Sequence, residues 1–530
     1  MCYVNLNHNV GHRPVHQSCR ARKPPRLRSV FSWRTVTPQM KLLLDIQRQL
    51  LRHPAHVFVQ DDQRQWKGLT LLVAAWHIAR AIEQTTKRER VAIMLPTSGL
   101  FPAALLATWM LGKSAIPLNY LLSRDDLEYV CRDAGVDCVV TVKPMLDFIG
   151  GPTASMKPLL MEDISFKGLP PMRRAKRRGD NELAVLLYTS GTSGKPKGVM
   201  LSCGNLAANI DQVVNWATFT RKDILLGVLP QFHSFGLTIL TLLPLAIAAK
   251  AIYTAKFVPR KILELGKHHQ PTVFVAIPSM YHALAAQKSG GKEHLGMLRY
   301  AVSGGEPLPA SVANEFFDKF GVRISEGYGL TETSPVTNWC LPAEYRARSV
   351  GRALPRVEQW IVDAHGNRLG ANQDGEIRMR GPNIMQGYWN LPAETAQVFD
   401  DNGFFRSGDM GRLDDDGHLY ITGRIKEMLI IAGENVFPRE IEEALNRHPS
   451  VKASAVIGAA DESRGETALA FVEMNEGFTF DEAALRAHCR EHMAQFKVPR
   501  AIRARKELPR NATGKIMRRL LSVDTPSEML

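Results

Sequence analysis

The sequence has no long uninterrupted apolar segment. Its longest mostly apolar run, Leu237 to Ala249, contains Pro244. A membrane-spanning helix needs about 20 predominantly apolar residues, and this run is shorter than that. We therefore expect no part of the chain to cross a bilayer.

Cysteine is also scarce, with seven in 530 residues and no two spaced as a CxxC pair. An odd number without such a pair argues against a disulfide framework or a zinc site and favours a reducing compartment, so we expect a cytoplasmic protein. None of the cysteines lies in a recognisable nucleophile setting, so a catalytic cysteine is not expected.

Acidic residues are missing from residues 1–39, which carry seven Arg or Lys. Three interpretations stay open: a disordered or non-native leader, an organellar transit peptide, and a basic binding arm. The lack of apolar periodicity and two adjacent prolines favour the first. Because Met40 opens the first amphipathic segment, we expect residues 1–39 to be dispensable for catalysis.

The net charge of +15 does not point to a nucleic-acid partner, since the leader holds much of the excess. A second basic run, Arg173–Arg178, lies in a Pro-rich linker. A solvated loop is the expectation there. The alternative is a peripheral electrostatic contact with the inner face of a membrane.

Short apolar strands alternate with helical stretches from Leu71 onward, which predicts an α/β fold with a mostly parallel sheet covered on both faces. The expected strands are Val91–Leu95, Leu183–Tyr188, Thr272–Ile277, Leu298–Val302 and Val322–Glu326, and the expected helices include Phe101–Leu111 and Pro259–His269. After about Ala353, Gly- and Asp-rich turns predict a small β-rich subdomain. Beyond Arg424 a compact α+β pattern predicts a separate C-terminal domain.

The strongest motif is Y-T-S-G-T-S-G-K-P-K-G at Tyr188–Gly198. It leaves a predicted strand and precedes a predicted helix from about Asn205. Glycines and hydroxyl residues in a strand-to-helix loop expose backbone N–H groups and side-chain donors that suit phosphate oxygens. Lys195 and Lys197 add positive charge. The motif is not a P-loop, because the spacing differs and Pro196 follows the first lysine.

With this loop the sequence resembles the superfamily of adenylate-forming enzymes: acyl-CoA synthetases, peptide-synthetase adenylation domains and beetle luciferases. It is most similar to the fatty-acid–CoA ligases, from Met40 to about Leu521. The resemblance implies ATP, Mg²⁺ and coenzyme A as reactants. It also implies an AMP-binding domain of residues 40–423 (β-rich subdomain about 353–423), a hinge at 424–426 and a mobile lid domain of residues 427–530. The phosphate-binding residues that it implies are Thr189, Ser190, Gly191, Thr192, Ser193, Gly194 and Lys197.

A second motif, G-Y-G-L-T-E, ends at Glu332. An aromatic ring beside glycines can stack on a base, and a carboxylate beside a hydroxyl can hold Mg²⁺ through oxygen ligands. The resemblance implies adenine against Tyr328 and Gly329, phosphate near Thr331 and magnesium on Glu332, with Thr331 and Glu332 catalytic. It also places Gly304, Gly305 and Glu306 where the adenine and acyl pockets meet.

Two further motifs lie toward the C-terminus. In R-S-G-D, a carboxylate fixed in a turn can accept the protons of ribose hydroxyls. The resemblance implies that Asp409 and Arg424 bind the ribose and that Lys426 is the hinge residue. In P-x-x-x-x-G-K at Pro509–Lys515, it implies that Lys515 stabilises the charge that develops during adenylate formation.

The sequence indicates the acid substrate and the thiol acceptor less specifically than it indicates the nucleotide. The resemblance puts His233 and Gly329 at the acyl pocket, and residues 231–249 contain no aspartate to pair an amino-acid ammonium. A medium or long aliphatic acid is expected, with aryl acids second. Gly433 would let the pantetheine arm of coenzyme A pass in a tunnel, although a turn glycine is the plain alternative. A carrier-protein thiol would use the same tunnel. The expected function is a fatty-acid–CoA ligase; an aryl-CoA ligase, an acyl-carrier-protein synthetase and an adenylation-only enzyme stay open.

Overall fold

The computed structural model describes residues 41–528 except 177, 191–194, 462–463 and 511–515. The chain divides into two units, Met1–Gln39 and Met40–Leu530. The first unit, and with it the predicted leader, lies outside the described residues.

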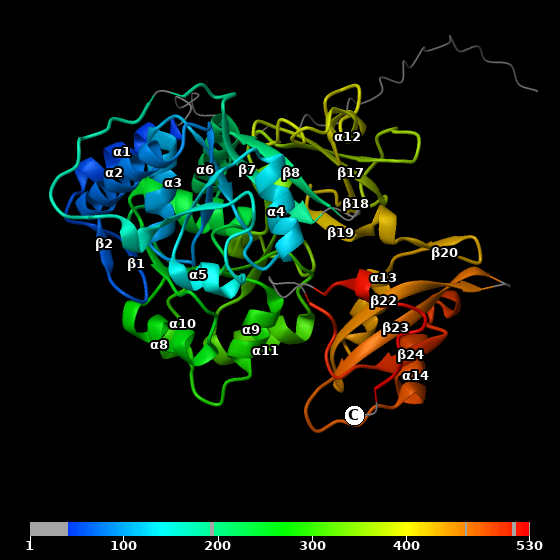
Figure 1. Ribbon diagram of the computed structural model, residues 1–530. Coiled ribbons are helices and arrows are strands. Elements are labelled where there is room, and N and C mark those ends of the chain that lie inside the picture. Colours follow the sequence, from blue (N-terminus) through cyan, green and yellow to red (C-terminus); the bar gives the residue numbers. More distant parts are fainter. Residues whose placement is uncertain (1–40, 177, 191–194, 462–463, 511–515, 529–530) are drawn as a thin grey trace, which may run out of the picture. The chain divides into compact units, whose positions relative to one another are not determined.

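Two mostly parallel sheets form the core of the larger, N-terminal part of the second unit (Figure 1). The smaller has the strand order β6-β5-β3-β4-β7-β8, and only the β7–β8 pair is antiparallel. Its strands are β3 (Arg90–Met94), β4 (Ser114–Pro117), β5 (Cys138–Thr141), β6 (Lys157–Leu160), β7 (Leu183–Ser190) and β8 (Pro196–Ser202). The helices in this part are α1 (Leu42–Arg52), α2 (Gly68–Thr85), α3 (Leu100–Met110), α4 (Arg124–Asp133) and α5 (Lys143–Phe148).

The larger sheet has nine strands in the order β15-β14-β13-β12-β11-β9-β10-β1-β2. They are β1 (Val57–Gln60), β2 (Gln65–Lys67), β9 (Ile224–Gly227), β10 (Lys250–Tyr253), β11 (Val273–Ala276), β12 (Tyr300–Ser303), β13 (Ile324–Gly329), β14 (Val336–Trp339) and β15 (Arg352–Ala353). The helices around it are α6 (Cys203–Trp216), α7 (Leu243–Ile247), α8 (Pro259–His269), α9 (Pro278–Ala285), α10 (Lys292–Leu295) and α11 (Ala310–Phe320).

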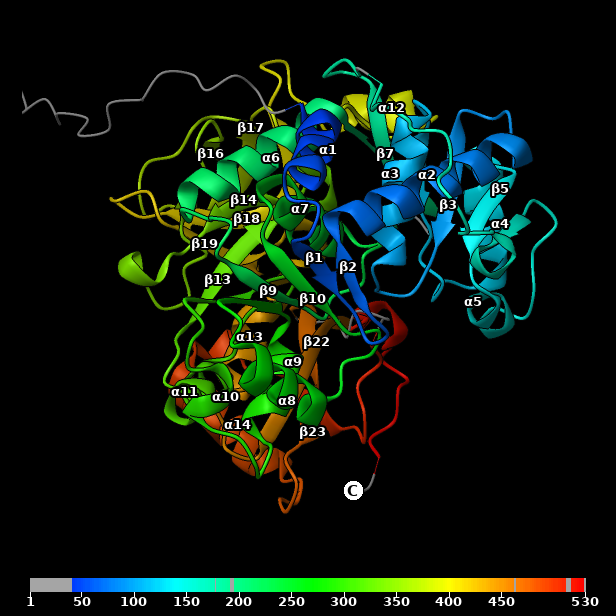
Figure 2. The ribbon, with the colours of Figure 1, turned by 90° about the vertical axis from the view of Figure 1, so that its left-hand side faces the viewer.

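The nine-stranded sheet is covered on both faces, because successive strand residues enter different hydrophobic clusters. Val273 packs with α6 and α7 residues, whereas Phe274 packs with residues of α8, α9 and α11. Figure 2 shows α8, α9, α10 and α11 grouped on one side of the strands and α1, α6 and α7 on the other. Burial on both faces explains the continuous apolar runs in the sequence and confirms the expected fold class.

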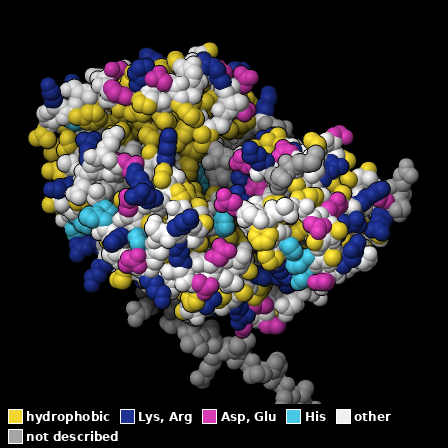
Figure 3. Space-filling model, turned by 90° about the horizontal axis from the view of Figure 1, so that it is seen from below, with side chains coloured by type: hydrophobic (Ala, Val, Ile, Leu, Met, Phe, Trp, Pro, Cys, Tyr) yellow, Lys and Arg dark blue, Asp and Glu magenta, His cyan; other side chains and the backbone are white. Residues whose placement is uncertain are grey.

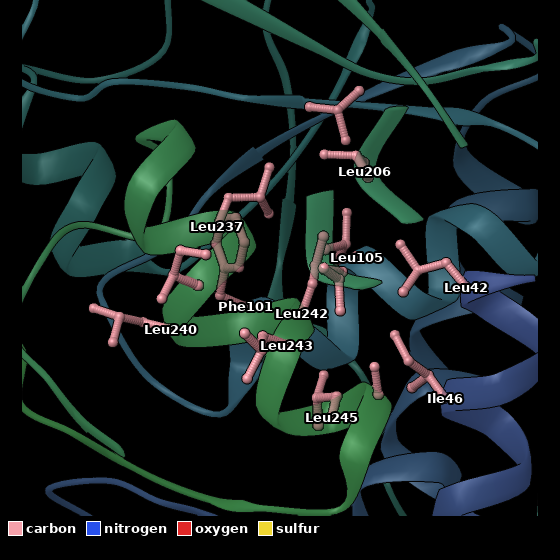
Figure 4. Packing of buried hydrophobic residues seen from close by; sticks show 14 of the residues in the cluster. Leu42, Ile46, Phe101, Leu105, Leu206, Leu237, Leu240, Leu242, Leu243 and Leu245 are labelled. Carbon is pink, nitrogen blue, oxygen red and sulfur yellow. The ribbon is translucent and has the colours of Figure 1, made fainter. Parts of the chain in front are cut away.

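The apolar run Leu237–Ala249 forms part of this core. It folds as a π-helical segment, Gly236–Leu242, followed directly by α7. Figure 4 shows Leu237, Leu242 and Leu245 packed among side chains of α1, α3 and α6. The run is therefore interior packing.

Two further sheets complete the chain. The four-stranded antiparallel sheet contains β16 (Glu358–Val362), β17 (Gly375–Arg380), β18 (Phe405–Leu413) and β19 (Leu419–Arg424), with α12 (Pro392–Gln397) between β17 and β18. The last sheet contains β20 (Leu429–Ile431), β21 (Glu434–Val436), β22 (Val451–Asp461), β23 (Gly465–Met474) and β24 (Ala501–Ala504), with α13 (Pro438–Leu445) and α14 (Glu482–His492). The expected α+β pattern after Arg424 is present.

The surface mixes charge and apolar side chains. Figure 3 shows one face, where hydrophobic side chains gather in a band beside a hollow and Lys and Arg side chains are spread over the rest. In the part of the chain that is described, no helix combines the length and the apolar character needed to cross a bilayer.

Candidate functional site

A cavity of about 810 Å³ brings together most of the predicted site residues. Those that line it are Thr189, Lys197, His233, Gly304, Gly305, Glu306, Tyr328, Gly329, Thr331, Glu332, Asp409, Arg424 and Lys426. Gly433 does not line it. The side chain of Ser190, at the end of β7, lies outside the described part of the chain, as do Gly191 to Gly194 and Lys515. Segments more than 200 residues apart in sequence thus meet at one place, while the role of each residue stays a prediction.

The phosphate-binding motif differs in setting from the sequence prediction. It was expected between a strand and a helix, but β7 pairs antiparallel with β8, so the described ends of the motif lie on two paired strands and α6 begins only after β8. Thr189 lies directly opposite Lys197 in this pairing. The Lys197 ammonium lies 5.4 Å from the centre of the Tyr388 ring. The two strands thus hold a hydroxyl and a cation side by side at the cavity. Both groups can donate hydrogen bonds to phosphate oxygens.

The predicted ribose-binding residues contact each other and Tyr328. Asp409 on β18 lies opposite Arg424 on β19, and Arg424 Nε is 3.0 Å from Asp409 Oδ1. The Tyr328 hydroxyl donates to Asp409 Oδ2 at 2.6 Å. Asp409 is only 3% exposed. Burial, together with this carboxylate, raises the pKa of Tyr328, so the hydroxyl stays a donor. The hydrogen bond between Tyr328, predicted to contact adenine, and Asp409, predicted to bind the ribose, was not predicted from the sequence.

The predicted magnesium ligand has a partner that sequence reasoning missed. The Tyr388 hydroxyl donates to Glu332 Oε1 at 2.9 Å, and Ser234 Oγ lies 3.4 Å from Thr331 Oγ1. Burial raises the pKa of Glu332. A carboxylate whose charged form is disfavoured by burial gains most from a cation, so these residues fit Mg²⁺. The aromatic pair Tyr388-Trp389 after Gly387 was the available signal in the sequence.

A second group of described residues offers three metal-ligating atoms within 4.8 Å of one another: His488, Glu491 and His492 on α14. None of them lines the cavity. Glu332 therefore remains the predicted magnesium ligand at the nucleotide site.

Two glycines at the cavity have close neighbours that leave little room for a side chain. A Cβ on Gly329 would lie 1.8 Å from the Pro335 carbonyl oxygen, and one on Gly304 would lie 2.9 Å from the Phe235 ring. Neither position accepts a larger residue without a shift of its neighbours. Gly329 was predicted to leave room for the acyl chain, and the backbone contact gives a second reason for glycine there.

Much of the cavity wall is apolar. The hydrophobic side chains that line the cavity, called here the apolar compartment, include Val213, Phe219, Leu229, Phe235, Ile239, Val273, Val275, Ile277, Val302, Val336 and Trp339. His233 lies at the cavity with its side chain exposed, and its Nδ1 accepts from the Phe235 N–H at 3.4 Å. The structure thus combines an apolar compartment and the predicted nucleotide-binding residues in one cavity.

The C-terminal part contributes further residues to the cavity. Lys426 lies in a 3₁₀ turn, Ile425–Glu427, directly after β19. Arg518, which sequence reasoning missed, also lines the cavity and pairs with Glu427 at 2.9 Å and Glu442 at 2.6 Å. The Ile516 N–H donates to Glu306 at 3.3 Å. Residues on both sides of the predicted hinge therefore border one cavity.

Gly433 occupies a different setting. It is the second residue of the two-residue turn between β20 and β21, after Ala432. Both residues have left-handed backbone conformations, with φ of 53° at Ala432 and 82° at Gly433. Hairpin turns of this type strongly favour glycine. The turn by itself accounts for the glycine, and the predicted tunnel for coenzyme A stays a proposal.

Glu326, just before the adenine motif, makes stability depend on pH. Burial raises its pKa to about 7 from an ordinary 4.5, although Arg439 and Arg348 oppose the shift. Between these values the folded protein keeps a proton that the unfolded chain releases, so stability falls as pH rises through this range. Glu326→Gln should therefore raise the free energy of unfolding at pH 8 by up to about 3 kcal/mol.

The measurement is urea denaturation of Glu326→Gln and the unchanged protein from pH 5 to pH 8. The difference in the free energy of unfolding between the two proteins should become smaller toward pH 5. A variant that is destabilised equally at all pH values would contradict this, and would instead assign the carboxylate a stabilising role toward the two arginines.

The family of the chain follows from comparison with known proteins. The profile of the AMP-binding enzymes matches residues 46–389, and that of the AMP-binding enzyme C-terminal domain matches residues 440–515. A long-chain-fatty-acid–CoA ligase of Bacillus subtilis is 33% identical over 82% of this chain and 85% of its own length. A feruloyl-CoA synthase of an Amycolatopsis species is 31% identical over 81% and 87%.

Solved structures show the same relationship. The ATP-bound crystal structure of MatB from Rhodopseudomonas palustris is 32% identical, superposes with a TM-score of 0.83 and is matched over 90% of this chain and 98% of its own. Acid–thiol ligases of this kind use ATP, Mg²⁺ and coenzyme A. The chain belongs to the AMP-binding enzyme family and is an acid–thiol CoA ligase.

Proposed function

We propose that this ligase activates a fatty acid of medium to long chain as its acyl-adenylate and transfers the acyl group to coenzyme A. The apolar compartment of the cavity carries the proposal, with walls that include Ile239, Val275 and Val302. Each methylene buried there would contribute up to about 0.8 kcal/mol. The long-chain-fatty-acid–CoA ligase among its relatives supports the same substrate class.

In the first half-reaction the carboxylate of the acid attacks ATP and pyrophosphate leaves. We assign Thr189 and Lys197 to the phosphates, Asp409 and Arg424 to the ribose, and Lys515 to the charge that develops between carboxylate and α-phosphate. Glu332 would hold Mg²⁺, which neutralises phosphate charge when it is bound. In the second half-reaction the thiol attacks the mixed anhydride and AMP leaves.

Aryl acids are the second candidate, because the compartment has an aromatic wall. The rings of Phe219 and Trp339 are stacked with centroids 6.0 Å apart. The buried Nε1 of Trp339 has no hydrogen-bond partner among the described residues. A ring substituent with an acceptor atom would suit that donor. The feruloyl-CoA synthase among the relatives is named for such an acid.

The acceptor and the location belong to the same proposal. We assign coenzyme A as the thiol and a cytoplasmic location. An acyl-carrier protein is the alternative acceptor. An adenylation-only enzyme would exchange pyrophosphate into ATP without forming thioester, so measuring both reactions separates these functions.

A panel of acids tests the substrate class. With ATP and coenzyme A, AMP release should rise in kcat/KM from acetate through octanoate to dodecanoate, by up to about fourfold per added methylene until the compartment is full. The fourfold figure is the free energy of one buried methylene expressed as a rate ratio. Acetate or benzoate exceeding dodecanoate would contradict the fatty-acid assignment, and ferulate exceeding it would favour the aryl candidate.

Trp339→Leu separates the two candidates further. The smaller side chain should lengthen the compartment and raise the ratio of kcat/KM for hexadecanoate over octanoate, while an aryl acid held by Trp339 would lose activity. A melting curve checks the fold, because the Trp339 ring also contacts Tyr300, with centroids 4.9 Å apart.

A further inference from the structure

Two apolar side chains between β6 and β7 are unusually exposed. Leu169 is 86% exposed and Met172 is 82% exposed, the highest values for large hydrophobic side chains in the described part of the chain. Phe166, three residues before Leu169, is 40% exposed. Single exposed apolar residues are ordinary, but three within seven residues form a patch that indicates an interaction.

The segment that carries these side chains is fixed to the body of the protein. Pro170, between the two exposed residues, is buried. The Gly168 carbonyl oxygen lies 3.1 Å from His77 Nε2. The Arg173 carbonyl oxygen accepts from Gln47 Nε2 and from Trp76 Nε1, both at 2.9 Å. In Figure 1 the segment is the blue-green loop at the left edge, outside α2. Leu169 and Met172 are thus held at the surface by an anchored loop.

The same segment is strongly basic. Between Asp163 and Asp180 there is no acidic residue, and the basic residues are Lys167, Arg173, Arg174, Lys176, Arg177 and Arg178. Arg173 bonds Glu83, and Arg178 pairs with Glu182 at 3.2 Å. Lys167 and Arg174 are exposed and form no ion pair within the described residues. Their charge is available to a partner.

We propose that residues 166–176, named here the basic apolar segment, bind the surface of an anionic lipid bilayer. Leu169 and Met172 would enter the boundary between headgroups and acyl chains, while Lys167, Arg174 and Lys176 contact the anionic headgroups. A nucleic acid would satisfy the charges but leave the two aliphatic side chains in water. The inference stands whether or not the acid substrate is a fatty acid.

Vesicle flotation of the full chain tests the proposal. The protein should float with phosphatidylcholine vesicles containing about a third phosphatidylglycerol and stay behind with pure phosphatidylcholine. Each basic residue near an anionic surface contributes about fivefold to binding, so Lys167→Gln with Arg174→Gln should weaken binding by roughly 25-fold. Leu169→Asp with Met172→Asp should weaken it at least as much.

Met297→Asp is the matched control, because Met297 is 63% exposed in a segment that follows Glu293 and lies outside the basic apolar segment. It should float like the unchanged protein. Residues 1–39 are the same in every variant, so their charge does not account for a difference. All variants should keep kcat/KM for dissolved octanoate. If the Asp variants melt at lower temperature, Leu169→Ser with Met172→Gln replaces them.

Three results would overturn the inference. The first is that the protein floats equally with neutral and anionic vesicles. The second is that the Leu169 and Met172 variants float as well as the unchanged protein, and the third is that Met297→Asp loses as much binding as those variants do. Binding to heparin through Lys167 and Arg174 without binding to anionic vesicles would assign the segment to a polyanion instead of a bilayer.

Discussion

Lys515→Ala should slow acyl-adenylate formation by about 10²–10³-fold, the usual effect of removing one donor to developing charge. The variant should still convert supplied acyl-adenylate and coenzyme A into thioester, since the charge that Lys515 would stabilise belongs to the first half-reaction. Pyrophosphate release measures the first half-reaction and thioester formation from synthetic adenylate measures the second. Equal loss of both in a folded protein would contradict separate roles for the two half-reactions.

Gly433 provides the complementary test, and its turn geometry dictates the control. Gly433→Leu should spare acyl-adenylate formation and block thioester formation if a side chain there obstructs the thiol. Leucine would also strain the left-handed backbone at φ 82°. Asparagine tolerates that conformation, and no atom lies within 4 Å of a Cβ built at this position. Loss of thioester formation in Gly433→Asn would support the tunnel. A fully active Gly433→Asn would mean that the turn conformation is the only role of Gly433.

Glu332→Gln should lower pyrophosphate release by about 10²–10³-fold, because it removes the charge proposed to hold Mg²⁺. Tyr388→Phe is the matched control: it keeps the carboxylate and deletes only the hydrogen bond of 2.9 Å. A partner of a metal ligand typically contributes 10–100-fold to metal affinity, so we expect about tenfold here, overcome by added Mg²⁺. Measuring rate against Mg²⁺ concentration distinguishes the two variants.

The pH profile gives an independent check on Glu332. Because burial raises the pKa of its carboxyl, the rate should fall as pH drops through a range above the ordinary one for a glutamate. Bound Mg²⁺ favours the charged form, so more Mg²⁺ should move this acidic limb to lower pH. Glu332→Gln should lack the limb. An unchanged acidic limb in Glu332→Gln would show that another group causes it.

The strands of the nucleotide-binding part were predictable because they are buried on both faces. Val91–Leu95 was expected as a strand, and β3 covers Arg90–Met94. The expected helix Pro259–His269 coincides with α8. β8 was missed because it begins P-K-G, which has little strand propensity. It is stabilised by pairing with β7 along its whole length, a tertiary context that the local sequence does not reveal.

The site shows the same division. Short motifs identified many of the polar residues that line the cavity, since the chemistry of phosphate, ribose and metal binding restricts the residue types. The links between motifs were not visible. Tyr388 meets Glu332 across 56 residues, and Tyr328 meets Asp409 across 81. Such partners depend on the approach of separate sheets, and neither composition nor spacing encodes that approach.

The pairing of Asp409 with Arg424 has a thermodynamic consequence for the reaction cycle. Arg424 ends β19, and the turn with Lys426 follows it without an intervening residue. The proposed ribose contact and the proposed pivot therefore share one piece of backbone. If the nucleotide binds one conformation of that backbone more tightly than another by some factor, thermodynamic linkage requires bound nucleotide to favour that conformation by the same factor. AMP bound at Asp409 would then slow the return of the lid domain to the conformation for adenylate formation. Release of AMP would allow that return and the binding of the next ATP.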